Sequence, residues 1–175
     1  MRLRPAESGD PLCLSVLATQ VFLDTYATEG IRPAIAREAL VAYSQEVFAS
    51  ALSDPLARVC VAGRGGHPVG FAHVVLGASH ELAPVGHQAE LLRLYVQESF
   101  TGKHIGTLLL AEAERLASEG GASVIWLTPW VRNHRALAFY RRGKYQDYGL
   151  TYFVFEGESH ENRVYAKRLR GTGAT

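Results

Sequence analysis

The chain has 175 residues, of which 47% are hydrophobic and 20% are charged, and its formal net charge is +1. This size and composition predict a single globular domain over residues 1–170, followed by a short disordered tail at 171–175. The balanced charge excludes the strongly basic surface of a typical nucleic-acid binder, so any anion site must be built locally.

The two cysteines, Cys13 and Cys60, match no metal-ligand spacing and are too few for a disulfide scaffold. Both lie in apolar runs, which favours two buried free thiols. No apolar run reaches the roughly 18 residues that a membrane span needs, and the first residues lack the apolar segment of a signal peptide. The histidines show no paired ligand spacing with a carboxylate. We therefore expect a cytoplasmic protein with no membrane segment and no metal site.

The N-terminal part predicts a short strand followed by two helices. Residues 2–4 form the strand, and Asp10 with Pro11 is typical of an N-cap and a first helical residue. Apolar residues at spacings of three and four then predict a helix that ends near Tyr26. The same periodicity predicts a second, continuous helix over residues 33–52.

The middle of the chain predicts three strands and one long helix. The β-rich runs at 57–64 and 69–77 are separated by a Gly-Gly-His-Pro turn, which predicts a hairpin. A strand is expected at about 89–97, and a helix at about 103–119 that a Gly-Gly pair closes.

The C-terminal part predicts a buried strand, a short helix and two further strands. These elements are expected at residues 123–130, 133–142, 145–155 and 162–169. The order of elements along the whole chain predicts an α/β domain, with one mixed central sheet flanked by helices.

Residues 99–107 read Ser-Phe-Thr-Gly-Lys-His-Ile-Gly-Thr and join a predicted strand to a predicted helix. The first turn of a helix has unpaired N–H groups and the positive end of the helix dipole, and a pyrophosphate satisfies both. Gly102 and Gly106 would let the backbone approach phosphate oxygens, while Lys103 and His104 add charge or donors. Taken alone, two glycines before a helix are also typical of an ordinary loop.

Asn133 and Tyr140 lie seven residues apart on the next predicted helix, so they project from the same side of it. Asn133 is a natural N-cap, and its side chain could also bond the amides of a pantetheine arm. Taken alone, Tyr140 is more typical of a core tyrosine whose hydroxyl reaches the edge of the core.

The stretch LRLYVQESFTGKHIGTLLL, followed by RNHRALAFYRRGKY, resembles the acetyl-CoA signature of the GCN5-related N-acetyltransferase (GNAT) superfamily. The order of elements resembles the GNAT (acyl-CoA N-acyltransferase) fold over nearly the whole chain. FLDTY, AELLRLYV, SFTGKHIG and IWLTPWVRN are similar to stretches of the PaiA-type spermidine/spermine N-acetyltransferases. Thr101 stands where the family has Arg or Gln, and His104 stands where it has its middle glycine. Lys144 stands where a glycine is common, and Gly143 comes one place early.

The resemblance implies acetyl-CoA as cosubstrate. Cys13 and Cys60 lie outside the motif, which favours direct transfer of the acetyl group over a ping-pong route. A backbone N–H near Leu94 or Tyr95 is expected to face the acetyl oxygen, and Val96 to pair with the pantetheine amides. Tyr140 is expected to protonate the leaving sulfur, and Asn133 to contact the pantetheine. The pyrophosphate is expected on the turn formed by Thr101, Gly102, Lys103, His104, Ile105, Gly106 and Thr107.

The acceptor amine must lose a proton, since only roughly one primary amine in a thousand is neutral at pH 7. Glu90 is the best candidate for the base because it begins the strand that carries Leu94. An extended strand separates the two residues by about 13 Å, so Glu90 would act through water. Glu90 is also compatible with a solvated carboxylate at the end of a strand, or with a group that only attracts the amine.

Further acceptor contacts are expected from Asp24, Tyr26 and Glu29, because acidic and aromatic groups suit an ammonium. These are also ordinary loop residues. We interpret the sequence as an N-acetyltransferase of a primary amine, with polyamines first. Acetylation of a peptide or protein amine stays open, as does a non-catalytic CoA-binding sensor. Aromatic residues in the last strands, together with the family, suggest a homodimer.

Overall fold

The computed structural model describes residues 1–155 and 157–169, so the predicted tail at 171–175 lies outside the described residues. The strands are β1 (Arg2–Pro5), β2 (Ala57–Arg64), β3 (His67–Leu76), β4 (Gln88–Val96), β5 (Val124–Leu127), β6 (Gln146–Phe155) and β7 (Glu158–Arg168). The helices are α1 (Pro11–Tyr26), α2 (Pro33–Ala42), α3 (Gln45–Ser53), the 3₁₀ turn η1 (Glu98–Phe100), α4 (Ile105–Glu119) and α5 (His134–Arg142).

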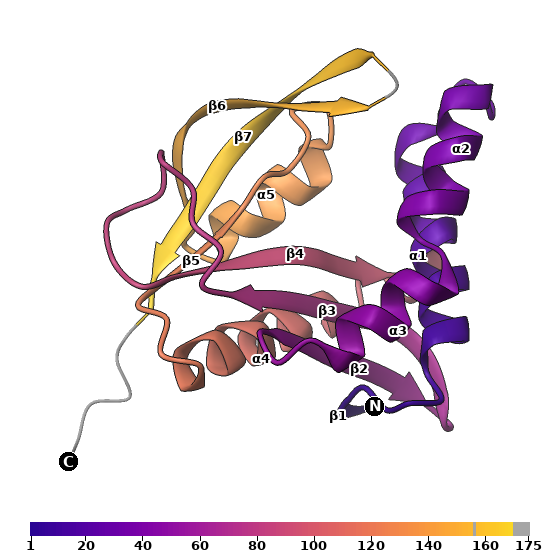
Figure 1. The fold of residues 1–175 in the computed structure, drawn as a ribbon, viewed down its shortest axis with the longest axis horizontal. Coiled ribbons are helices and arrows are strands. Elements are labelled where there is room, and N and C mark those ends of the chain that lie inside the picture. Colours follow the sequence, from indigo (N-terminus) through magenta and orange to yellow (C-terminus); the bar gives the residue numbers. More distant parts are fainter. Residues whose placement is uncertain (156, 170–175) are drawn as a thin grey trace. The chain divides into compact units, whose positions relative to one another are not determined.

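The seven strands form one sheet in the order β1-β2-β3-β4-β5-β7-β6 (Figure 1). β4 and β5 are parallel, whereas β1 pairs with β2, and β7 with both β5 and β6, in antiparallel fashion. The predicted mixed sheet is therefore confirmed.

The chain divides into two compact units. Among the described residues, the first unit comprises 1–73 and 93–113, and the second comprises 74–92, 114–155 and 157–169. The elements β3, β4 and α4 each begin in one unit and end in the other.

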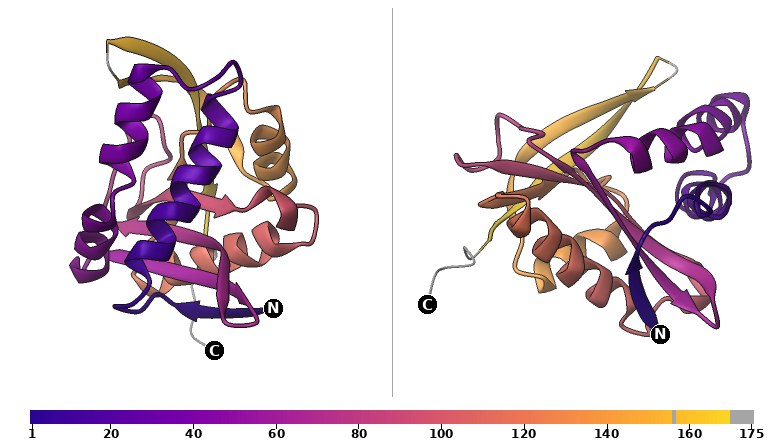
Figure 2. Two further views of the ribbon diagram at one scale, coloured as in Figure 1. Left: turned by 90° about the vertical axis from the view of Figure 1, so that its right-hand side faces the viewer. Right: turned by 60° about the horizontal axis from the view of Figure 1, so that its bottom comes forward.

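In the first unit, helices pack on both faces of the strands (Figure 2). Phe48 of α3 contacts the ring of Phe71 on β3 edge-on, with centroids 5.6 Å apart. On the opposite face, a Cβ placed on Gly70 would lie 3.2 Å from a methyl group of Leu109 on α4. Because adjacent strand residues point to opposite faces, Phe71 and Gly70 mark the two packing layers.

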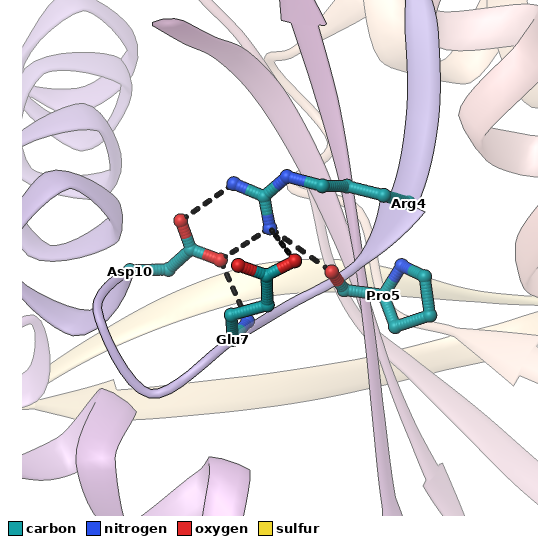
Figure 3. Close-up of polar contacts among 4 residues, drawn as sticks. All are labelled: Arg4, Pro5, Glu7 and Asp10. Atoms are coloured by element: carbon teal, nitrogen blue, oxygen red, sulfur yellow. Dashed lines mark hydrogen bonds and ion pairs between the residues drawn. The ribbon is translucent and has the colours of Figure 1, made fainter. Parts of the chain in front are cut away.

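Asp10 precedes α1 as predicted, but its side chain does not cap the helix. Its carboxylate instead accepts hydrogen bonds from Arg4 at 2.6 and 2.8 Å and from the N–H of Glu7 at 2.7 Å (Figure 3). The bonds from Arg4 hold the pKa of this buried carboxyl below its usual range. Asp10 thus ties the start of α1 to the end of β1.

The continuous helix predicted over 33–52 is wrong, because α2 ends at Ala42 and α3 begins at Gln45. Ser44 has an extended backbone, and its hydroxyl accepts a hydrogen bond from the N–H of Val47 at 3.4 Å. Serine offers the backbone this capping geometry as an alternative to continued helix.

In the second unit, β5 ends at Leu127, shorter than the predicted strand over 123–130. Pro129 has no N–H for a ladder, and Trp130 forms only an isolated bridge to Asn162. β7 begins at Glu158 rather than near residue 162, so β6 and β7 make a longer hairpin than predicted, and α5 lies beside it (Figure 1).

Cys13 and Cys60 are both free thiols, as predicted, and Cys60 is buried. The prediction that Cys13 is buried is wrong. Cys13 lies on the outward face of α1 with Leu12 and Val16, which are also exposed, while Leu14 and Leu17 face the core.

Candidate active site

β4 is paired with β5 over only a short stretch. The ladder comprises the pairs Gln88–Val124, Ala89–Ile125 and Glu90–Trp126. β4 nevertheless continues to Val96. No β5 pairing extends past Glu90 in the part of the chain that the structure describes, so the backbone groups on that side of the strand are available to a ligand. An extended pantetheine arm needs such an edge of backbone donors and acceptors.

The turn that follows β4 is held by its own hydrogen bonds. The hydroxyl of Thr101 donates to the carbonyl of Glu98 at 2.8 Å. The ammonium of Lys103 donates to the carbonyl of Ser99 at 2.8 Å and lies 5.1 Å from the centroid of the Phe100 ring. Lys103 therefore folds back over η1, and from there it supplies a positive charge beside the turn.

Gly102 and His104 both have left-handed backbones, with φ angles of 72° and 61°. A Cβ on Gly102 would meet nothing within 4 Å, so the space above this residue is open. His104 adopts a conformation that glycine adopts most easily, at the position where the family has glycine. Because of this conformation, α4 begins at Ile105, two residues after the predicted start.

The first turn of α4 has the features of an anion site. The N–H of Leu108 makes the first hydrogen bond of the helix, to the carbonyl of His104 at 3.1 Å. The N–H groups of Ile105, Gly106 and Thr107 precede that bond, so the helix itself offers them no carbonyl. Gly106 is half-buried and Thr107 is exposed. This turn therefore fits a pyrophosphate through backbone donors and the helix dipole.

Asn133 caps α5, as its type predicted. Its side-chain oxygen accepts a hydrogen bond from the N–H of Ala136 at 3.0 Å. The oxygen is committed to the helix, so a contact with a ligand would use the side-chain NH₂ group as a donor.

Tyr140 is buried in the last full turn of α5, with 7% of its surface exposed. The N–H of Tyr145 donates to its carbonyl at 3.0 Å, and the N–H of Lys144 donates to the carbonyl of Arg141 at 3.0 Å. These two bonds define a Schellman motif, in which Lys144 takes the left-handed position with φ 65°. The ring of Tyr145 contacts the ring of Tyr140 edge-on, with centroids 5.6 Å apart.

A half-buried ion pair lies beside this motif, and the sequence did not point to it. The ammonium of Lys167 donates to both carboxylate oxygens of Glu114 at 2.8 Å and lies 5.5 Å from the centroid of the Tyr145 ring. Burial, with the negative charge of Glu114 added, raises the pKa of Tyr145 well above its usual value. Arg141 donates to the hydroxyl of Tyr165 at 2.8 Å, which fixes the same helical turn to β7.

Glu90 lies in the three-pair ladder opposite Trp126 and is half-buried. It is the last residue of β4 that pairs with β5, immediately before the stretch that β5 leaves open. The predicted acceptor residues Asp24 and Tyr26 lie in the last turn of α1, and Glu29 lies exposed in the loop after it.

Tyr26 belongs to an aromatic cluster that the sequence reasoning missed. Its ring lies 5.0 Å from that of Phe22, which lies 5.0 Å from that of Tyr43. The hydroxyls of Tyr43 and Tyr95 are 3.1 Å apart. Burial raises the pKa of all three tyrosines, so they carry neutral hydroxyls.

Arg93 joins this cluster to α2. Its guanidinium carbon lies 5.4 and 5.5 Å from the ring centroids of Tyr43 and Phe48. One terminal nitrogen of the guanidinium donates to the carbonyl of Ala42 at 3.3 Å. Its second terminal nitrogen lies 3.3 Å from Nδ1 of His73, a residue with 4% exposure. Burial, with the charge of Arg93 added, lowers the pKa of His73 to about 4.

Over residues 1–155 and 157–169, no group of three His, Cys, Asp or Glu residues is placed to hold a metal ion. Within the same ranges, no helix has both the length and the apolar character that crossing a bilayer requires.

A family model described as acetyltransferase (GNAT) family matches residues 25–144. The chain belongs to the GNAT family. The predicted resemblance is thus confirmed, and with it the GNAT fold and an acetyl-CoA-dependent N-acetyltransferase.

Three individual N-acetyltransferases that resemble the chain are between 23% and 34% identical to it. An uncharacterized N-acetyltransferase of Mycobacterium tuberculosis is 28% identical over 135 residues, which cover 74% of this chain and 81% of that protein. Spermidine N(1)-acetyltransferase of Thermoplasma acidophilum is 34% identical over 88 residues, covering 49% of this chain and 55% of that enzyme. The crystal structure of the PaiA N-acetyltransferase of T. acidophilum in complex with coenzyme A matches with a TM-score of 0.74 and 23% identity, over 95% of this chain and 98% of that one.

Proposed function

We propose that this GNAT enzyme acetylates the primary amine of a small molecule, with a polyamine as the first candidate. The observation that carries the proposal is the edge of β4 that β5 leaves open beyond Glu90, followed, after η1 and the turn to His104, by the N-terminus of α4, whose first N–H groups find no carbonyl within the helix. One polar edge and one anion site in succession suit the two chemical parts of acetyl-CoA, its amide-containing arm and its diphosphate. The spermidine acetyltransferase among the relatives supports a polyamine acceptor.

We assign the diphosphate to the backbone from Gly102 to Thr107, with Lys103 contributing charge. Val96 pairs with the amides of the arm, and Asn133 donates to it. A backbone N–H of Leu94 or Tyr95 stabilises the negative charge that develops on the acetyl oxygen. Donors of this kind lower a barrier by about 3 kcal/mol each.

The proton transfers need a base for the amine and an acid for the sulfur. Glu90 accepts the ammonium proton through water, and the neutral amine attacks the acetyl carbon. As the C–S bond breaks, Tyr140 donates its hydroxyl proton to the departing thiolate. The nitrogen, now bonded to the acetyl carbon, gives up its extra proton to the Tyr140 oxygen, so the products are the acetamide and free CoA thiol. Neither cysteine is required, since the amine itself is the nucleophile.

Acidic and aromatic residues near the end of α1 supply the remaining acceptor contacts. Asp24 and Glu29 attract the second ammonium of a polyamine, and the ring face of Tyr26 adds a cation–π contact. We place the reaction in the cytoplasm, which suits the two free thiols. The exposed apolar residues of the β6–β7 hairpin, Tyr152 and Val154 among them, support a homodimer.

The test measures release of free thiol from acetyl-CoA with a panel of acceptors. Spermidine, spermine and a monoamine represent the small amines, and a lysine-containing peptide represents the alternative acceptor. Turnover with polyamines and weak turnover with the peptide is expected. The reverse order would favour a peptide or protein amine, and tight CoA binding without turnover on any acceptor would favour a sensor.

Tyr140→Phe tests the acid separately. It should lower kcat about a hundredfold while leaving the KM for acetyl-CoA within a factor of two, because the ring stays and only the proton donor is lost. Unchanged kcat would remove the acid role from Tyr140.

A further inference from the structure

Tyr145 contacts both the backbone and the ring of Tyr140, and the two residues belong to the same compact unit. We propose that Tyr145 is a positioning residue, which holds the hydroxyl of Tyr140 where it can protonate the leaving sulfur. The proposal rests on the acid role assigned to Tyr140 above.

The backbone contact belongs to the helix end rather than to the side chain. The N–H of Tyr145 closes the Schellman motif on the carbonyl of Tyr140, and any residue other than proline supplies that N–H. Substitution of Tyr145 therefore keeps the end of α5 in place. What its side chain adds is the edge-on ring contact, with an interplanar angle of 64°.

The ring of Tyr145 is itself fixed on its other sides. It is 4% exposed, and the ammonium of Lys167 lies 5.5 Å from its centroid. Lys167 on β7 is held by both oxygens of Glu114 on α4, so two elements outside α5 set the position of the ring. Packing against a buried, oriented ring limits rotation of the Tyr140 ring about its side-chain bonds.

Such a limit matters because the tyrosine hydroxyl is the atom furthest from the backbone. A small rotation of the ring moves the hydroxyl more than any other atom of Tyr140, and misplacement of a reacting group by about 1 Å can cost a hundredfold in rate. The hydroxyl of Tyr145 has no part in this argument. Phenylalanine at position 145 should hold Tyr140 as well as tyrosine does.

The experiment compares Tyr145→Leu, Tyr145→Phe and Tyr140→Phe with the double variant Y140F/Y145L, under saturating acetyl-CoA and acceptor. Tyr145→Leu should lower kcat about tenfold with an unchanged KM for acetyl-CoA, and Tyr145→Phe should stay within twofold of wild type. The double variant should turn over no more slowly than Tyr140→Phe, because a hydroxyl that is absent cannot be misplaced. Val124→Ala, a fully buried truncation on β5, controls for lost stability.

Two results would overturn the positioning role. One is a wild-type kcat in Tyr145→Leu, and the other is a tenfold fall that persists when Tyr140 is already phenylalanine. Either leaves the acid role intact if Tyr140→Phe alone is slow, so the two proposals fail separately. Tyr145→Met, whose unbranched and flexible side chain fills irregular space more readily, gives the same comparison if the leucine variant does not fold.

Discussion

Lys144 occupies the left-handed position after α5, and replacing it with glycine should stabilise the protein. α4 ends with the same pair of hydrogen bonds, from Ala122 to Ala117 and from Gly121 to Ser118, both at 2.9 Å. There the left-handed residue is Gly121, with φ 87°. The two helix ends therefore differ mainly in the residue that adopts the unfavourable backbone angle.

The magnitude follows from that angle. A left-handed backbone costs a residue with a Cβ about 1–2 kcal/mol, and glycine gives part of this back through its larger loss of conformational entropy on folding. The side chain of Lys144 is exposed and makes no hydrogen bond or ion pair with any residue the structure describes, so little is lost with it. Lys144→Gly should raise the free energy of unfolding by about 1 kcal/mol, or Tm by about 2–4 °C.

The reverse change supplies the control. A Cβ at Gly121 would meet nothing within 4 Å, so Gly121→Lys introduces the backbone cost with no steric clash. It should lower the free energy of unfolding by about 1 kcal/mol. Thermal and urea unfolding followed by circular dichroism measure both variants. A lower Tm for Lys144→Gly, or no loss for Gly121→Lys, would show that the backbone angle does not decide the stability of these helix ends.

Three further predictions concern the anion site, a buried histidine and the assembly. Gly106→Val should weaken CoA binding at least a hundredfold by calorimetry while leaving the circular dichroism spectrum unchanged. Leu108→Val, at an exposed position of the same helix, should bind CoA normally. Normal binding by Gly106→Val would show that the turn is misassigned. The pKa of His73 is about 4 in the folded protein and about 6.5 in the unfolded chain. The stability that neutral His73 contributes is therefore complete above pH 6.5, and the free energy of unfolding falls by about 3 kcal/mol as the pH is lowered toward 4. In urea titrations at pH 7 and 4.5, His73→Gln should lose less free energy of unfolding between the two pH values than the wild-type protein does. An equal loss in both proteins would contradict this prediction. Light scattering should find a dimer that Tyr152→Glu converts to a monomer, since Tyr152 is 60% exposed on the edge strand β6; a monomeric wild-type protein would exclude this assembly.

The sequence predicted well the features that depend on residues close together in the chain. The cap of α5 followed from the type of Asn133 and its place before an apolar period, and the turn before α4 followed from its glycines. The break between α2 and α3 was missed because the apolar period continues across it, while a single serine hydroxyl redirects the backbone.

Features that depend on tertiary contacts could not be predicted in the same way. Asp10 stands at an N-cap position, but its carboxylate accepts two short hydrogen bonds from Arg4 of the preceding strand and none from the first turn of α1. Lys167 and Glu114 are far apart in sequence, and only the fold brings them together beside Tyr145. Tyr145 did carry a local signal, because it ends the segment that resembles the family signature.

The covalent path between the two units has a consequence for dissecting this enzyme. The boundary falls inside β3, inside β4 and inside α4, so every crossing runs through the middle of a regular element and none through a flexible linker. No single cut of the chain releases either unit as a continuous fragment, and each cut at a boundary severs a strand or a helix. Separately expressed halves should therefore be insoluble or unfolded. Neither unit can be removed or exchanged as a module without breaking a strand or a helix of the other.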